Sequence, residues 1–219
     1  RRGCRLSGGV VQVGEHNMLA LSEHELQGLR GNRVSYIAQS AAAAFNPAKK
    51  LIDQVVEGAL IHDLGSRAVL EAKAIELFRD LALPDPERIG QRYPHQVSGG
   101  QLQRVMAAMA LISDPLLVVL DEPTTALDVT TQREILRLIK QLQEEQGSAV
   151  LFITHDMGVV ADIADEVLVM HKGCAVEQGS RDEVLFRPQA DYTRMLLSSV
   201  PSITPPPPRP VPSGAPLLR

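Results

Sequence analysis

A serine followed by two glycines and a glutamine has the composition of a phosphate-binding helix start. These residues are Ser98, Gly99, Gly100 and Gln101. Ser98 can cap the helix that follows it, and the two glycines let a large anion approach bare backbone N–H groups. Because a helix N-terminus of this kind binds anions, we expect this stretch to contact phosphate groups.

Two adjacent carboxylates, Asp121 and Glu122, lie where a buried strand is expected to end. Residues 116–120 form a continuous apolar run of strand length, as in a parallel strand buried on both faces. In open α/β sheets, ligands bind at the carboxyl edge of such strands. This acid pair taken alone could equally be the start of an acidic loop. Pro123, which stiffens the turn, and the TALD segment at residues 125–128 favour a functional site.

Two further polar residues, Gln39 and His155, follow other expected strands. Val34–Ile37 and Ala149–Ile153 have strand length, and segments with helical periodicity separate them from residues 116–120. Alternation of strands and helices implies a parallel sheet with helices on its faces. We therefore expect Gln39 and His155 to lie with the acid pair at one edge of the sheet.

Capping residues and apolar periodicity predict the elements around these strands. A short strand is expected over residues 10–13, and Ser22 with Glu25 forms the capping-box pattern of a helix over residues 22–30. Another helix is expected over residues 130–146, and a hairpin over residues 167–178. After residue 46 apolar residues recur with a period near 3.6. In the second helix of that region they are Val69, Leu70, Ala74, Leu77, Phe78 and Leu81.

Taken in order, three sequence stretches resemble motifs of the ATP-binding cassette (ABC) ATPases. VSGGQLQR resembles the signature motif, LLVVLDEP the Walker B motif, and TALD the D-loop. The resemblance covers nearly the whole chain and implies an α/β, P-loop NTPase-like fold with a parallel sheet and an inserted helical subdomain. Residues 40–47 and 191–197 are similar to the ABC ATPases of di- and oligopeptide or nickel importers. Residues 190–193 read ADYT, where that group usually has HPYT.

The resemblance assigns roles around ATP and Mg²⁺. Asp121 would hold Mg²⁺ through water, and Glu122 would polarise the attacking water as a general base. Gln39 would touch both the Mg²⁺ and that water, and would link the site to the transport partner. His155 would contact the γ-phosphate.

The resemblance also implies a nucleotide sandwiched between two ABC ATPase subunits, in a homodimer or a heterodimer. Ser98, Gly99, Gly100 and Gln101 would cover the γ-phosphate of the nucleotide held by the other subunit, and Asp128 would act across the same interface. ATP would drive transmembrane permease subunits and, indirectly, a solute-binding protein. The chain would then be a peripheral protein at the cytoplasmic face of the inner (plasma) membrane.

Four segments follow from this interpretation. Residues 1–45 would be the remainder of the nucleotide-binding core up to the Q-loop, and residues 46–97 the helical subdomain. Residues 98–185 would carry the signature, Walker B, D-loop and H-loop parts of the core. Residues 186–219 would be a C-terminal extension with a proline-rich tail.

Composition excludes several classes of function. The net charge of −4 gives no overall attraction to nucleic acid. Cys4 and Cys174 lie far apart, without a CxxC pattern, so we expect neither a disulfide framework nor a zinc site, and a reducing compartment suits them. No apolar run reaches the roughly 20 residues of a membrane span.

The glycine-rich P-loop of such ATPases, GxxxxGK[ST], does not occur in the sequence. None of the lysines follows a glycine and precedes serine or threonine; they are Lys49, Lys50, Lys73, Lys140 and Lys172. Since the P-loop supplies the backbone N–H groups and the lysine that bind the phosphates, we expect that part of the site upstream of Arg1, with the chain truncated at its N-terminus.

Two other classes of function stay open at this stage. A DNA-repair or chromosome-maintenance ATPase could use the same cassette, although residues 39–98 contain neither a long heptad repeat nor zinc cysteines. A non-catalytic subunit could lend only its signature face to an intact partner. Glu122 and His155 favour an active site.

Overall fold

The computed structural model describes residues 8–123, 136–137, 140–141, 143 and 147–199. The chain divides into two compact units, Arg1–His155 and Asp156–Arg219, which are described separately. Asp128 and most of the helix expected at residues 130–146 lie outside the described residues. In the part of the chain that the structure describes, no helix is long and apolar enough to cross a membrane.

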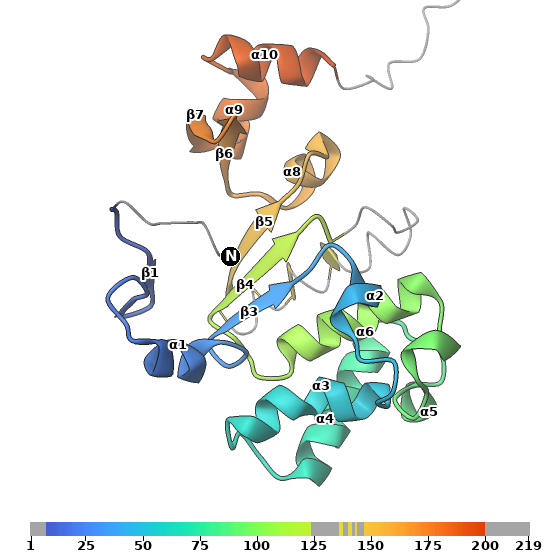
Figure 1. Cartoon of the computed structure of the whole chain (residues 1–219). Coiled ribbons are helices and arrows are strands. Elements are labelled where there is room, and N and C mark those ends of the chain that lie inside the picture. Colours follow the sequence, from blue (N-terminus) through green and yellow to red (C-terminus); the bar gives the residue numbers. More distant parts are fainter. Residues whose placement is uncertain (1–7, 124–135, 138–139, 142, 144–146, 200–219) are drawn as a thin grey trace, which may run out of the picture. The chain divides into compact units, whose positions relative to one another are not determined.

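A parallel sheet lies at the centre of the first unit (Figure 1). Its described strands are β3 (Val34–Ile37), β4 (Leu117–Asp121) and β5 (Ala149–Ile153), in the order β3-β4-β5. Both pairings are parallel, as the alternation of strands and helices predicts. β4 begins one residue later than expected and includes Asp121. All three strands therefore end at the edge where ligands of such sheets bind.

The two faces of this sheet differ in burial. Ile37, Val118 and Leu120 project to one face and are buried, whereas Leu151 and Ile153 project to the other and are 53% and 46% exposed. Within residues 116–120 Leu117 and Val119 are only half-buried and Leu116 is 41% exposed, so the prediction that this run is buried on both faces is wrong for the described structure. Successive side chains of a strand point to opposite faces, and the described helices of this unit pack against only one of them.

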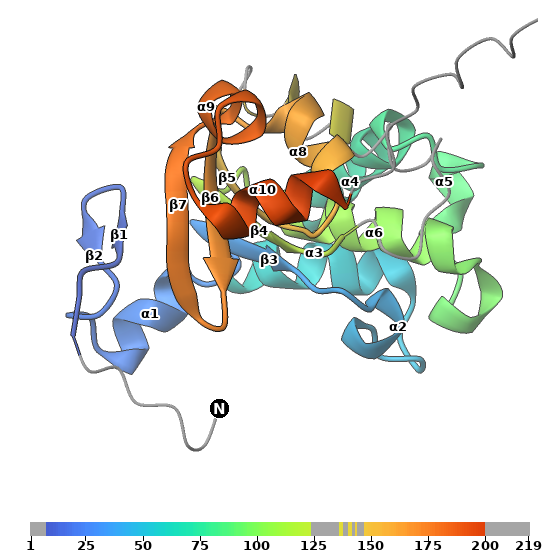
Figure 2. The ribbon, with the colours of Figure 1, turned by 90° about the horizontal axis from the view of Figure 1, so that it is seen from above.

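Helices gather on the buried face of the sheet (Figures 1 and 2). They are α2 (Ala41–Ala44), α3 (Leu51–Ile61), α4 (Arg67–Asp80), α5 (Pro86–Ile89) and α6 (Gly99–Leu111), with a short 3-10 turn at Pro94–Gln96. The apolar stripe predicted for α4 is buried except at Val69, which is 61% exposed. Val69 directly precedes Leu70, the first buried residue of the stripe, and a step of one residue turns its side chain about 100° around the helix, away from the core.

The chain before the sheet forms a small hairpin and one capped helix. β1 (Gln12–Val13) pairs antiparallel with β2 (His16–Asn17), so the strand expected at residues 10–13 is shorter than predicted. Val10 and Val11 are exposed and precede the strand, and the Val11 carbonyl accepts the Met18 N–H at 2.8 Å. The helix α1 (Glu23–Leu29) carries the predicted capping box between Ser22 and Glu25. Gly31 follows with φ of 75°, the left-handed conformation that glycine favours after a helix.

The described part of the second unit, residues 156–199, contains the predicted hairpin and three helices. After α8 (Met157–Ile163), β6 (Glu166–His171) pairs antiparallel with β7 (Cys174–Ser180). Lys172 and Gly173 both have positive φ, as a two-residue hairpin turn requires. α9 (Arg181–Phe186) and α10 (Asp191–Ser198) follow.

The start of α10, where residues 190–193 read ADYT, is held to the hairpin by a ring contact and two backbone hydrogen bonds. The ring of Tyr192 stacks on His171, with centroids 4.0 Å apart. The backbone N–H groups of Gln189 and Ala190 donate to the Glu177 carboxylate at 2.7 and 3.1 Å. These bonds, the one from Gln189 foremost, lower the pKa of Glu177. The helix is thus held to β7 and β6.

Candidate active site

Glu122 is the centre of a polar group at the carboxyl edge of the sheet. Its Oε2 accepts a hydrogen bond from Gln39 Nε2 at 3.1 Å, and its Oε1 lies 3.1 Å from His155 Nδ1. Gln39 follows β3, Glu122 follows β4 and His155 follows β5. The structure therefore brings together three of the residues that the sequence predicts for the site, across 83 and 33 positions of chain.

The backbone of Glu122 leaves the strand abruptly. Its N–H still donates to the Ile153 carbonyl at 2.9 Å, extending the ladder between β4 and β5, yet its φ is 47°. A non-glycine residue in this left-handed region is uncommon and is held there by its surroundings. Gln103 of α6 supplies one such hold, because its buried Nε2 donates to the Pro123 carbonyl at 3.1 Å. The turn thereby presents the Glu122 carboxylate to Gln39 and His155.

Asp121 has a partner that the sequence pattern did not indicate. Tyr36 Oη donates to its Oδ2 at 2.8 Å. In the register of the sheet Tyr36 lies opposite Val119, so Tyr36 and Asp121 project from the same face as diagonal neighbours. Alternation along β3 puts Tyr36 on that face, but only the register shows that its hydroxyl reaches Asp121.

The hydrogen bond between His155 Nδ1 and Glu122 leaves the second ring nitrogen, Nε2, facing away from that bond. When Nδ1 carries a proton and donates to Glu122, Nε2 is an acceptor in the neutral ring and a donor in the protonated ring. The His155 side chain is 74% exposed and that of Glu122 is 29% exposed, so an incoming anion can reach the ring.

The oxygen donors at this edge suit Mg²⁺. They are the carboxylates of Asp121 and Glu122 and the amide oxygen of Gln39, and Mg²⁺ is usually bound through one or two carboxylates together with substrate phosphates. Among the described residues no group of three or more His, Cys, Asp or Glu could hold a metal alone. The residues fit a Mg²⁺ that is also bound by a nucleotide.

The predicted capping of the glycine stretch is present at the start of α6. Ser98 Oγ accepts the Gln101 N–H at 3.2 Å, and Gln101 Oε1 accepts the Ser98 N–H at 3.0 Å. These hydrogen bonds lie within the stretch and do not join it to Glu122. An added Cβ at Gly99 would meet no atom within 4 Å, so packing within this chain does not require glycine there. The first N–H groups of a helix have no partner inside it.

A family model described as "AAA domain, putative AbiEii toxin, Type IV TA system" matches residues 18–161. Over 194 residues the chain is 47% identical to the probable peptide ABC transporter ATP-binding protein y4tR of Sinorhizobium fredii, covering 89% of this chain and 58% of that protein. Over 195 residues it is 43% identical to the oligopeptide transport ATP-binding protein OppD of Bacillus subtilis, covering 89% of this chain and 54% of that protein. The chain thus spans little more than half the length of these relatives.

A solved structure of similar fold is also named as an ATP-binding cassette. The chain superposes on a dimeric, post-hydrolysis state of the ATP-binding cassette MJ0796 bound to ADP and Pi, with a TM-score of 0.71 and 27% identity. The superposition covers 80% of this chain and 74% of that one. The structural similarity and the ABC transporter relatives both agree with the order of the motifs in the sequence and with the residues gathered at the strand ends. The chain belongs to the AAA-domain family that the matching model describes and, by its relatives, to the ATP-binding cassette ATPases.

Proposed function

We propose that this chain is part of an ATP-hydrolysing subunit of an ABC importer that takes up peptides. The observation that carries the proposal is the Glu122 carboxylate, held between Gln39 and His155 at the carboxyl edge of the sheet. The names of y4tR and OppD, a probable peptide transporter and an oligopeptide transporter subunit, support the class of solute.

In this proposal the strand-edge residues perform the hydrolytic step. Glu122 accepts a hydrogen bond from the attacking water and orients it, as a general base does. Gln39 lies within hydrogen-bond distance of the same carboxylate and reports the position of the water and metal. His155 contacts the γ-phosphate through Nε2. Asp121 holds Mg²⁺, which when bound with ATP neutralises phosphate charge.

The glycine stretch serves the other subunit. Ser98, Gly99, Gly100 and Gln101 present a capped helix start with room above Gly99, and Asp128 is proposed to act at the same interface. The dimeric form of the MJ0796 cassette supports such a pairing. A second ABC ATPase subunit, like or unlike this one, and permease subunits complete the machine at the cytoplasmic face of the membrane. A solute-binding protein takes part indirectly.

The proposal is tested with the full-length subunit, assembled with its permease in vesicles. We expect uptake of labelled oligopeptides that requires both ATP and Mg²⁺. ATP hydrolysis stimulated by DNA, with no peptide uptake, would instead place the protein among the DNA-repair or chromosome-maintenance ATPases.

A further inference from the structure

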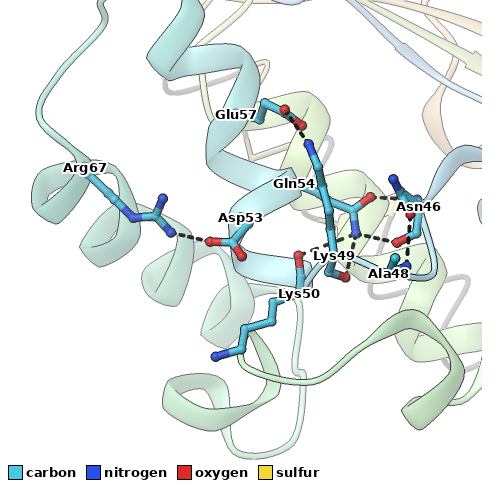
Figure 3. A network of polar contacts seen from close by, with 8 residues as sticks. All are labelled: Asn46, Ala48, Lys49, Lys50, Asp53, Gln54, Glu57 and Arg67. Atoms are coloured by element: carbon cyan, nitrogen blue, oxygen red, sulfur yellow. Dashed lines mark hydrogen bonds and ion pairs between the residues drawn. The ribbon is translucent and has the colours of Figure 1, made fainter.

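One buried glutamine holds the turn that joins α2 to α3. Gln54, in the first turn of α3, is 8% exposed. Its Nε2 donates to the carbonyl oxygens of Asn46 and Lys49, both at 3.1 Å, and its Oε1 accepts the Asn46 N–H at 2.8 Å (Figure 3). We call Gln54 together with residues 46–50 the Gln54 clasp. A single side chain thus binds both ends of the turn.

The other contacts of the clasp are weaker or local. The Lys50 carbonyl lies 3.4 Å from Gln54 Nε2, and the Ala48 N–H donates to Asn46 Oδ1 at 2.9 Å. Figure 3 also shows ion pairs at the rim, such as Lys49 with Glu57 at 2.7 Å. The two side chains of that pair are 47% and 48% exposed, and exposed pairs contribute little to stability. The buried amide of Gln54 is therefore the main polar tie of the turn.

The clasped turn is the far end of the segment that begins at Gln39. Asn46 follows Gln39 by only seven residues (46 − 39). Between them α2 packs into the core of the unit through Ala41, which is buried. The segment is thus held at Gln39 by Glu122, at Ala41 and the C-cap Phe45 by the core, and at Asn46 by Gln54.

We propose that Gln54 is a positioning residue for the hydrolytic site, because the clasp fixes the far end of the segment that carries Gln39. This inference rests on the proposed function. Without Gln54 the Asn46 N–H and the Lys49 carbonyl lose their Gln54 partner, and the Asn46 carbonyl keeps the Lys49 N–H at 3.2 Å. The buried amide then no longer ties the turn to α3, so the turn rearranges. Over so short a segment that rearrangement displaces α2 and Gln39. Since a misplacement of about 1 Å can lower a rate about 100-fold, turnover depends on the clasp.

The test uses two substitutions and one matched control in the full-length subunit with its permease. Gln54→Glu keeps an acceptor for the Asn46 N–H but removes both donors. Gln54→Met keeps the length of the side chain without any strong hydrogen bond, and serves if the buried charge prevents folding. Gln91→Glu makes the same chemical change nearby. Because Gln91 Oε1 only accepts from Lys50 Nζ, at 3.0 Å, a carboxylate can replace it.

Hydrogen exchange tests whether the clasp exists, and steady-state kinetics tests whether turnover depends on it. In Gln54→Met, which loses the acceptor, we expect hydrogen exchange at the Asn46 amide to be at least about tenfold faster, which corresponds to about 1.4 kcal/mol. Gln54→Glu keeps the acceptor for the Asn46 N–H, and exchange at that amide should stay close to wild type. In both variants we expect kcat for ATP to fall between about 5-fold and 100-fold, with KM for MgATP within about twofold of wild type. Gln91→Glu should change neither quantity.

Each contrary result overturns a separate part of the inference. Unchanged exchange at the Asn46 amide in folded Gln54→Met contradicts the clasp. Faster exchange with unchanged kcat shows that the clasp is only structural. An equal loss of kcat in Gln91→Glu shows that added charge, not the clasp, is responsible. If the wild-type complex hydrolyses no ATP, the proposed function fails and the role in turnover with it, while the exchange measurement still decides whether the clasp exists.

Discussion

Replacement of Glu122 by glutamine is the perturbation that bears most directly on the hydrolytic role. The Glu122 side chain is 29% exposed and touches Gln39 and His155 at 3.1 Å each. Glutamine fills the same volume and keeps one acceptor oxygen, so at most one of the two hydrogen bonds is lost. A hydrogen bond of this kind contributes about 1 kcal/mol, and the folded structure should therefore persist.

The effect on turnover should be much larger than the effect on stability. A general base contributes about 10²- to 10⁴-fold to a rate, and an amide cannot accept the proton of the attacking water. In the full-length subunit we expect kcat of Glu122→Gln to fall by at least about 100-fold. The dissociation constant for MgATP should stay within about threefold of wild type, because the amide adds no negative charge near the phosphates.

The assay combines steady-state phosphate release with calorimetric titration of ATP. Glu76→Gln is the matched control, since Glu76 is exposed on α4 and the same carboxylate is exchanged for an amide. Turnover equal to wild type in Glu122→Gln would refute the role of general base. If ATP binding and turnover are both lost, Glu122 is needed to bind the nucleotide or to keep the protein folded.

Further predictions concern the metal, the isolated chain and the second unit. Tyr36→Phe removes the hydrogen bond to Asp121 and should raise the Mg²⁺ concentration for half-maximal ATP binding about 3- to 10-fold; Tyr192→Phe should not. A polypeptide limited to residues 1–219 contains no GxxxxGK[ST], and should bind ATP more weakly than about 1 mM by calorimetry. At the start of α9 Ser180 and Glu183 form a capping box, in which the Ser180 hydroxyl lowers the pKa of Glu183 below the ordinary 4.5. Stability from this capping box is present above pH 4.5 and is lost as the pH falls through the lowered pKa. In chemical denaturation, wild type should therefore lose more free energy of unfolding in acid than Glu183→Gln. Equal losses in the two proteins would contradict this.

Local patterns predicted the elements that depend on neighbouring residues. β3 and β5 occupy the predicted residues, because short segments rich in β-branched and aromatic residues favour strands whether or not both faces are buried. The capping boxes at Ser22 and Ser98 formed because the cap and its partner lie three residues apart. Placement of Gln39, Glu122 and His155 at one edge followed from parallel strands alone.

Contacts across the fold could not be predicted from local patterns. Tyr36 reaches Asp121 only through the register of β3 against β4. Gln103 and Gln54 look like ordinary helical glutamines, and their roles depend on which turn packs against each of them. The exposed face at Leu151 was unexpected for the same reason, since burial of a strand depends on what packs on each side.

Mixed dimers test most directly whether the acid pair and the glycine stretch belong to opposite halves of one nucleotide site. Glu122→Gln disables the hydrolytic half. Gly99→Glu disables the covering half, because it places a carboxylate against the phosphates, while the open space above Gly99 and the helix start tolerate it in the fold. The two changes are placed either in one full-length subunit or in different subunits of a pair of linked copies.

The phosphate-release rate of these linked pairs is the deciding measurement. With the changes in different subunits, one site keeps an intact Glu122 and an intact Gly99, and we expect up to about half of the wild-type rate. With both changes in one subunit, each site lacks one half, and we expect less than about 5%. Equal rates for the two arrangements would contradict the shared site, and a higher rate with both changes in one subunit would show that each subunit hydrolyses ATP by itself.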